Sequence, residues 1–232
     1  MGPRLSSASY FPDASSAGRS LAGDSLALPV ALHWSPKSPF VRKVMIVLIE
    51  CGLAGQVEKI RTPVDRRRPN VAYMQQNPLG TIPALRLSDE TLLFDSPLIC
   101  DYLLTLRPRP DLLPSTGRQR FDVLRRQAFA DAMLDAILLW RQERIRPAAE
   151  QSAEIHAAYA IKASAALDRL DVDARTFAGA FDLGHIATGS ALAYLDLRFP
   201  DMEWRHGRNG LAAWYRRFED HPSARATRLT LD

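Results

Sequence analysis

Two short segments in the first third of the sequence carry side chains arranged to hold a small anionic or peptide-like molecule. Ser38, followed by Pro39 and Phe40, puts a hydroxyl at the predicted start of a helix. Backbone N–H groups and the helix dipole favour an anion at such a position. Ile82 and Pro83 form an X-Pro turn that leaves a backbone edge free to pair with a peptide-like ligand.

The hydroxyl of Ser38 could stabilise a bound thiolate, which is the nucleophilic form of a thiol. Lowering a thiol pKa by about two units requires roughly 2.7 kcal/mol. The helix dipole supplies about 0.3–1 kcal/mol, whereas a hydrogen bond to a charged group supplies about 1.5–3 kcal/mol. A serine before a proline is also a common N-cap, so capping alone explains the residue equally well.

Asp95 and Ser96 begin another predicted helix, with Pro97 in its first turn. A plain N-cap again accounts for the pair. The functional interpretation is that Asp95 accepts from the α-ammonium group of a ligand, while the Ser96 hydroxyl donates to its α-carboxylate. If these residues only cap the helix, removing either side chain should lower stability. If they bind a ligand, removing either should lower the affinity for that ligand.

The pattern of apolar and turn residues predicts two halves of different class, α/β followed by all-α. Expected strands cover residues 30–33, 56–61, 84–87 and 91–94, with helices at 39–50, at 71–76 and from Ser96 onward. This βαβ and ββα order indicates a thioredoxin-like domain. Alternating prolines at 107–111 break the chain, and helices are expected at about 116–146, 152–170, 183–199 and 210–220. The predicted organisation is a disordered extension (1–29), a thioredoxin-like ligand-binding domain (30–107), a linker (108–115) and an all-helical domain (116–232).

Composition excludes several classes of protein. The 232 residues are 47% hydrophobic and 24% charged, and the net charge of +4 comes from scattered arginines, which argues against a nucleic-acid partner. The two cysteines, Cys51 and Cys100, lack CxxC spacing, which argues against a metal site and for a reducing compartment. Both cysteines are expected to be buried as small hydrophobic residues. No apolar run is long enough for a membrane span, so a cytoplasmic protein is predicted.

Taken in order, these segments resemble the cytosolic glutathione S-transferase superfamily, in its serine-type bacterial branch, over about residues 30–230. The resemblance implies that glutathione is the co-substrate, that no metal takes part and that Ser38 is catalytic. It also implies a cis peptide bond at Pro83. The glutathione-binding residues it implies are Phe40, Ile82, Pro83, Asp95 and Ser96.

The implied function is conjugation of the glutathione thiolate to a small hydrophobic electrophile bound between the halves. Alternatives are a glutathione-dependent peroxidase or reductase, and a non-catalytic binding module. Thr81 stands where many relatives carry lysine, and Arg66–Arg68 form either a solvated loop or a contact to the glycyl carboxylate. The sixth-helix capping box has Asp182 followed by His185, and we expect His185 to weaken that cap.

The long helix predicted at 116–146 has apolar residues on more than one face. One face must pack on its own domain, and the remainder suits a partner subunit, so a homodimer is predicted. The side chains concerned include Phe121, Leu124, Phe129, Met133, Ile137 and Leu138. Met133, Ile137, Leu138 and Trp140 are either core residues or the wall of the second-substrate site.

Overall fold

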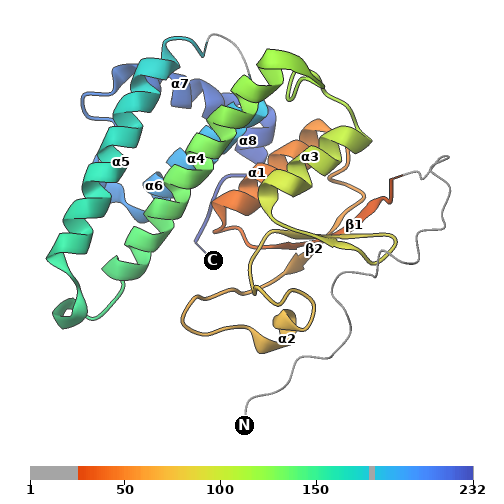
Figure 1. Ribbon diagram of the computed structural model, residues 1–232, viewed down its shortest axis with the longest axis horizontal. Coiled ribbons are helices and arrows are strands. Elements are labelled where there is room, and N and C mark those ends of the chain that lie inside the picture. Colours follow the sequence, from red (N-terminus) through yellow and green to blue (C-terminus); the bar gives the residue numbers. More distant parts are fainter. Residues whose placement is uncertain (1–25, 178–180, 232) are drawn as a thin grey trace.

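The computed structural model describes residues 26–177 and 181–231, so most of the predicted disordered extension lies outside the described residues. A sheet half and a helical half lie side by side (Figure 1). The helical half follows the proline-rich break, and the two halves share one continuous buried core. No helix in these two ranges has both the length and the apolar character that a membrane crossing requires.

The sheet has four strands in the order β2-β1-β3-β4. They are β1 (Pro29–Trp34), β2 (Glu58–Arg61), β3 (Ala84–Leu87) and β4 (Leu92–Leu93). β1 runs parallel to β2, while the other two pairings are antiparallel. Three helices accompany them: α1 (Pro39–Glu50), α2 (Val71–Met74) and α3 (Ser96–Leu106). The mixed sheet and its helices confirm the predicted thioredoxin-like half.

Helix α1 follows from signals in its own sequence. The Ser38 hydroxyl oxygen accepts from the Val41 N–H at 3.3 Å, Pro39 occupies the first turn, and Gly52 takes a left-handed conformation (φ +68°) beyond the end. Its apolar face is buried, as predicted. Arg42 and Lys43 lie off that face yet are only 2% and 1% exposed, because the helical half covers them.

The helical half contains α4 (Gly117–Arg144), α5 (Ala153–Ala174), α6 (Leu183–Arg198), α7 (Asn209–Asp220) and α8 (Pro222–Ala226). These elements confirm the predicted all-helical character of this half. Helix α6 is buried along most of its length and contacts both α4 and α1. Figure 1 shows it behind α4. Short 3₁₀ turns at Ala148–Glu150 and Pro200–Met202, like α8, are too brief for sequence periodicity to reveal.

The observed N-cap of α6 differs from the one expected from the sequence. The Asp182 carboxylate accepts from the His185 N–H at 3.0 Å, and the His185 ring nitrogen Nδ1 lies 3.3 Å from the Asp182 N–H, which closes the box. The same nitrogen lies 2.8 Å from Asp182 Oδ1. An unprotonated Nδ1 accepts from the Asp182 N–H and a protonated Nδ1 donates to the carboxylate, so either tautomer ties the ring to the N-cap residue. Arg126 also donates to the Asp182 carboxylate. The expectation that His185 weakens this cap was therefore wrong.

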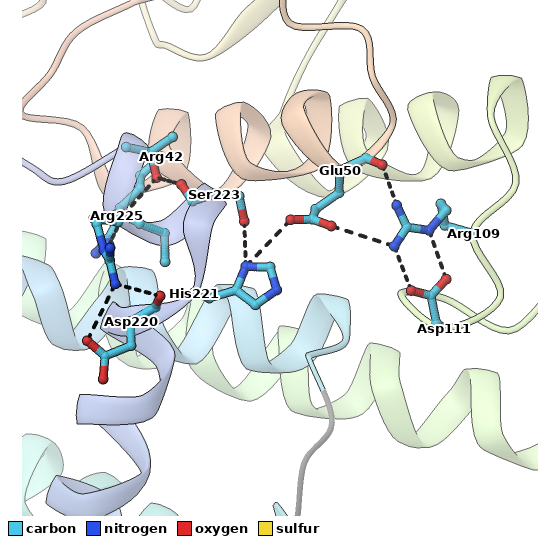
Figure 2. Close-up of polar contacts among 10 residues, drawn as sticks. Arg42, Glu50, Arg109, Asp111, Asp220, His221, Ser223 and Arg225 are labelled. Carbon is cyan, nitrogen blue, oxygen red and sulfur yellow. Dashed lines mark hydrogen bonds and ion pairs between the residues drawn. The ribbon is translucent and has the colours of Figure 1, made fainter.

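A polar network joins the end of α1 to the linker and to α8 (Figure 2). The Glu50 carboxylate lies 3.6 Å from both Arg109 Nη2 and His221 Nδ1. Ser223 Oγ lies 3.0 Å from the same His221 nitrogen, and Arg109 also pairs with Asp111 at 2.7 Å. The linker is thereby held against the helix that begins at Ser38.

Candidate active site at the carboxyl edge of the sheet

Strand register brings the three sequence-predicted segments to one edge of the sheet. His33, near the carboxyl end of β1, pairs with Ala84, so the Ile82–Pro83 turn lies beside the loop that leads to Ser38. Leu93 pairs with Leu85, which carries the chain from β4 back to the same edge at Asp95. Because β2 runs parallel to β1, the loop containing Arg66–Arg68 also leaves from this edge.

The Ile82–Pro83 peptide bond is cis, as the resemblance implies. The turn before it is fixed at the Thr81 carbonyl, which accepts from the Tyr73 hydroxyl at 2.8 Å and from Asn77 Nδ2 at 2.9 Å. Asn77 is fully buried, and Tyr73 is 4% exposed. The main chain of Ile82 forms no hydrogen bond with any residue in the described ranges, so it is available to a ligand.

In the third segment, the side chains of Asp95 and Ser96 differ in burial. Asp95 is the N-cap residue of α3 by its backbone, but its carboxylate makes no capping hydrogen bond and is exposed. Ser96 is 1% exposed. Capping therefore does not account for the Asp95 side chain, whereas Ser38 does cap its own helix.

Near Ser38, a buried ion pair joins the two halves. Lys43 Nζ lies 2.6 and 2.8 Å from the two carboxylate oxygens of Asp131 on α4. The same ammonium group lies 5.7 Å from the centre of the Phe40 ring. The pair fixes the first turns of α1 against the middle of α4, and so positions Ser38 relative to the helical half.

Three carboxylates lie near this ion pair, where the sheet half meets the helical half. They belong to Asp95, Asp131 and Asp135. Burial raises the pKa of Asp131, Lys43 opposes the shift, and Asp95 adds to it. Burial also raises the pKa of Asp135, with a further contribution from Asp131, while Arg66 opposes it. Lys43 and Arg66 offset part of this charge, and the carboxylate excess at the Asp95 end favours a cationic group such as an α-ammonium.

The loop containing Arg66–Arg68 lies where the sheet half meets the end of α4. Arg66, Arg67 and Arg68 are all exposed, and Arg67 Nη1 donates to the Ile145 carbonyl at 3.4 Å. A hollow of about 430 Å³ lies where this loop meets α4 and α5, with Arg66 and Leu139 in its lining. Arg66 also interacts electrostatically with Asp135 on α4 and with Tyr194 on α6.

Helix α4 contributes both charged and apolar side chains where the two halves meet. Met133, Ile137 and Trp140 are 5%, 0% and 8% exposed and belong to the core, whereas Leu138 is half-buried against it. The residues missed from the sequence are the charged ones, Asp131 and Asp135. Both lie on the α4 face toward the sheet half, at i, i+4 spacing. The segment that contains them also resembles a bacterial branch of the superfamily, but the sequence assigns neither carboxylate a role.

Neither cysteine provides a reactive thiolate. Burial raises the pKa of Cys51 to about 11 and that of Cys100 to about 12. Cys100 is fully buried as expected, but Cys51 is only half-buried at the end of α1, so that part of the expectation was wrong. In the part of the chain that the structure describes, no three His, Cys, Asp or Glu side chains gather as metal ligands.

Comparison with known proteins agrees with this geometry. Residues 37–106 match the glutathione S-transferase N-terminal domain, and residues 149–217 match the C-terminal domain. The chain is 33% identical over 171 residues to the uncharacterized GST-like protein YibF of Escherichia coli K12, covering 72% of this chain and 82% of that protein.

Two solved structures of a glutathione transferase family member from Pseudomonas fluorescens Pf-5 share the fold. One contains glutathione and superposes with a TM-score of 0.83 at 37% identity, covering 87% of this chain and 99% of that one. The other contains S-(propanoic acid)-glutathione, with a TM-score of 0.80 at 36% identity and the same coverage. The chain therefore belongs to the glutathione S-transferase superfamily.

Proposed function

We propose that this protein is a glutathione transferase of the serine-type bacterial branch, acting in the cytoplasm on small electrophiles. The observation that carries the proposal is the meeting of Ser38, the Ile82–Pro83 turn and Asp95 at one edge of the sheet. Glutathione bound to a Pseudomonas fluorescens relative at 37% identity supports the choice of co-substrate.

Each segment has a role in this proposal. The main chain of Ile82 pairs with the cysteinyl residue of glutathione, Asp95 accepts from its α-ammonium group, and Ser96 donates to its α-carboxylate. Phe40 and Pro83 pack against the ligand. The Ser38 hydroxyl donates to the thiolate sulfur while its oxygen continues to accept from the Val41 N–H, since one hydroxyl can do both.

The reaction is a displacement or an addition at an electrophilic carbon. The thiol proton leaves to solvent, and the thiolate forms a C–S bond. In a displacement the leaving group departs with its electron pair, and in an addition a proton from solvent completes the product. Thiol–disulfide exchange is not favoured, because Ser38 occupies the reactive position and both cysteine thiols have raised pKa values.

Replacing Ser38 with alanine tests the proposal directly. We expect Ser38→Ala to lower the conjugation rate by about ten- to hundredfold, and to raise the pKa of bound glutathione by about one to two units. Affinity for glutathione should change less, because the hydroxyl acts mainly on the ionised sulfur. Calorimetry and the pH dependence of the rate measure both effects.

Ser152→Ala is the matched control for that variant. The Ser152 hydroxyl caps α5 by accepting from the Ile155 N–H at 3.3 Å, the same geometry and distance as the Ser38 cap. Its loss should cost about 1 kcal/mol of stability and leave the pH–rate profile unchanged. If the two variants lose activity and stability alike, Ser38 is a cap and the assignment fails.

The Asp95 and Ser96 contacts lead to a separate expectation. Asp95→Ala and Ser96→Ala should each weaken glutathione binding by about 1–3 kcal/mol, as measured by calorimetry. Because the Asp95 carboxylate makes no capping bond, Asp95→Ala should leave the melting temperature nearly unchanged. A lower melting temperature with unchanged affinity would remove Asp95 from the site.

We also propose a homodimer. On α4, Phe121 and Phe129 are 69% and 39% exposed, and Leu98 on α3 is 49% exposed. An apolar surface of this kind suits a partner subunit. Sedimentation at micromolar concentration should give a species of about twice the 25.9 kDa chain mass. A single species at the chain mass would contradict the dimer.

A further inference from the structure

Two arginines on the helical half lie close together without a carboxylate between them. Arg141 is in the last turn of α4, Arg198 is the last residue of α6, and each lies within the electrostatic range of the other. Over residues 26–177 and 181–231, no acidic side chain forms an ion pair with either one. The Nε atom of Arg198 is buried and has no hydrogen-bond partner there.

Other arginines with largely buried side chains form ion pairs with acidic residues. Arg42 pairs with a glutamate at 2.6 Å, and Arg208 pairs with an aspartate at 2.7 Å. Arg141 and Arg198 differ from these, because each acts electrostatically on the other and no acidic side chain in the described ranges forms an ion pair with either. Burial lowers the pKa of Arg198, and the charge of Arg141 lowers it further.

A tyrosine hydroxyl belongs to the same group. Tyr194 precedes Arg198 by one turn of α6, so both side chains project from the same face of the helix. Tyr194 is 3% exposed, and burial raises its pKa even though both arginines oppose the shift. The hydroxyl therefore keeps its proton at neutral pH. Its oxygen accepts from Arg198, and its proton can be donated to a further group.

This arrangement is unfavourable without a ligand. Two partly desolvated like charges repel each other, and an unpaired buried donor loses its hydration. Groups perturbed in this way are characteristic of functional sites, where the ligand supplies the missing charge. A carboxylate matches the group best, because its two oxygens can accept from a guanidinium in parallel.

The position of the group separates it from the proposed glutathione contacts. Arg66 of the sheet half acts electrostatically on both Tyr194 and Asp135, so the group lies on the side of the helical half that is nearest to Arg66. Arg141 is ten residues beyond Asp131 on α4, which is about 15 Å along the helix. The proposed contacts to glutathione all come from the sheet half.

We propose that Arg141 and Arg198, with the Tyr194 hydroxyl, bind a carboxylate carried by the second substrate. The electrophiles of this enzyme would then be acidic: small molecules with a carboxylate attached to the fragment that accepts the sulfur. This inference rests on the proposed glutathione transferase function and specifies its substrate class.

The first experiment compares two glutathione derivatives that differ only in charge on the sulfur substituent. Calorimetry would measure S-(2-carboxyethyl)glutathione and S-propylglutathione against the wild type, Arg141→Gln, Arg198→Gln and Tyr194→Phe. We expect the wild type to bind the carboxyethyl derivative about tenfold more tightly, and each glutamine variant to lose that preference. Arg216→Gln, at an exposed position on α7, is the matched control and should keep the preference.

A second experiment needs no glutathione. The wild type should bind 3,5-dinitrobenzoate about tenfold more tightly than 3,5-dinitrobenzamide, and Arg198→Gln should bind the two equally. If glutathione fails to bind but this preference holds, the proposed transferase function fails and the carboxylate site stands. If the wild type does not distinguish the benzoate from the amide, the site is overturned.

Two further outcomes contradict the proposal. Equal weakening of glutathione and both derivatives in the glutamine variants would show that the arginines hold the glycyl carboxylate of glutathione itself. A fall in melting temperature with unchanged ligand preference would assign them a structural role. We expect the opposite, an unchanged or higher melting temperature in Arg198→Gln, because the variant removes a repulsion.

Discussion

Replacing Lys43 with methionine should destabilise the protein by about 3–5 kcal/mol, the range measured when one member of a buried ion pair is removed. Lys43 is 1% exposed and its partner Asp131 has a side chain 17% exposed, so the variant leaves a carboxylate in a largely dry position. Urea unfolding measures the loss. Lys162→Met, at an exposed lysine on α5, is the control and should change stability by less than about 0.5 kcal/mol.

The pH dependence of that variant gives a second measurement. Without Lys43, the largest opposition to burial is removed, and the folded-state pKa of Asp131 rises further above the ordinary value. A raised carboxyl pKa gives stability that is present at low pH and is lost as the pH rises through the folded-state value. The deficit against the wild type should therefore shrink on acidification. The double variant Lys43→Met, Asp131→Leu should recover most of the lost stability. If the deficit does not shrink at low pH and the double variant recovers nothing, the buried ion pair is not the source of the loss.

Replacing Gly189 with alanine should also cost about 3 kcal/mol of stability. A Cβ atom at this position would lie 2.2 Å from Cε1 of Phe218, much closer than any real contact. Phe218 cannot withdraw easily, because its ring packs against Trp214 and Tyr215 and lies 5.5 Å from the Arg42 guanidinium. The cost of overpacking exceeds the gain of about 1 kcal/mol in helix propensity.

The chain offers a matched control for this substitution. A Cβ atom at Gly55 would have no neighbour within 4 Å among the described residues, so Gly55→Ala should stay within about 0.5 kcal/mol of the wild type. Shortening the opposing ring, as in Gly189→Ala, Phe218→Leu, should restore part of the loss. Equal unfolding curves for the Gly189 and Gly55 variants would show that Gly189 of α6 does not pack tightly against Phe218 of α7.

The sequence predicted the elements whose signals are local. The bounds of α1 follow from Ser38, Pro39 and Gly52, all within or next to the helix, and the structure reproduces them. The hairpin and the start of α3 were predicted for the same reason. Local signals also located the three segments at the sheet edge, although their roles toward glutathione remain predictions.

The electrostatic part of the site could not be predicted in the same way. Lys43 and Asp131 are separated by 88 residues, and only the packing of α1 on α4 shows that they pair. The Arg141 and Arg198 group depends on the alignment of α4 with α6, which no periodicity specifies. His185 shows the same limit at short range, because an imidazole in place of a carboxylate closes the capping box only in the geometry that the fold provides.

The way α1 presents Arg42 and Lys43 to the helical half has a consequence for the history of this protein. Their partners, Glu219 and Asp131, lie more than eighty residues away, beyond the proline-rich break. A recombination event at that break would place two buried cations against a surface selected in another lineage. Exchange of halves between relatives should therefore give a stable protein only where the incoming half carries acids at the matching positions.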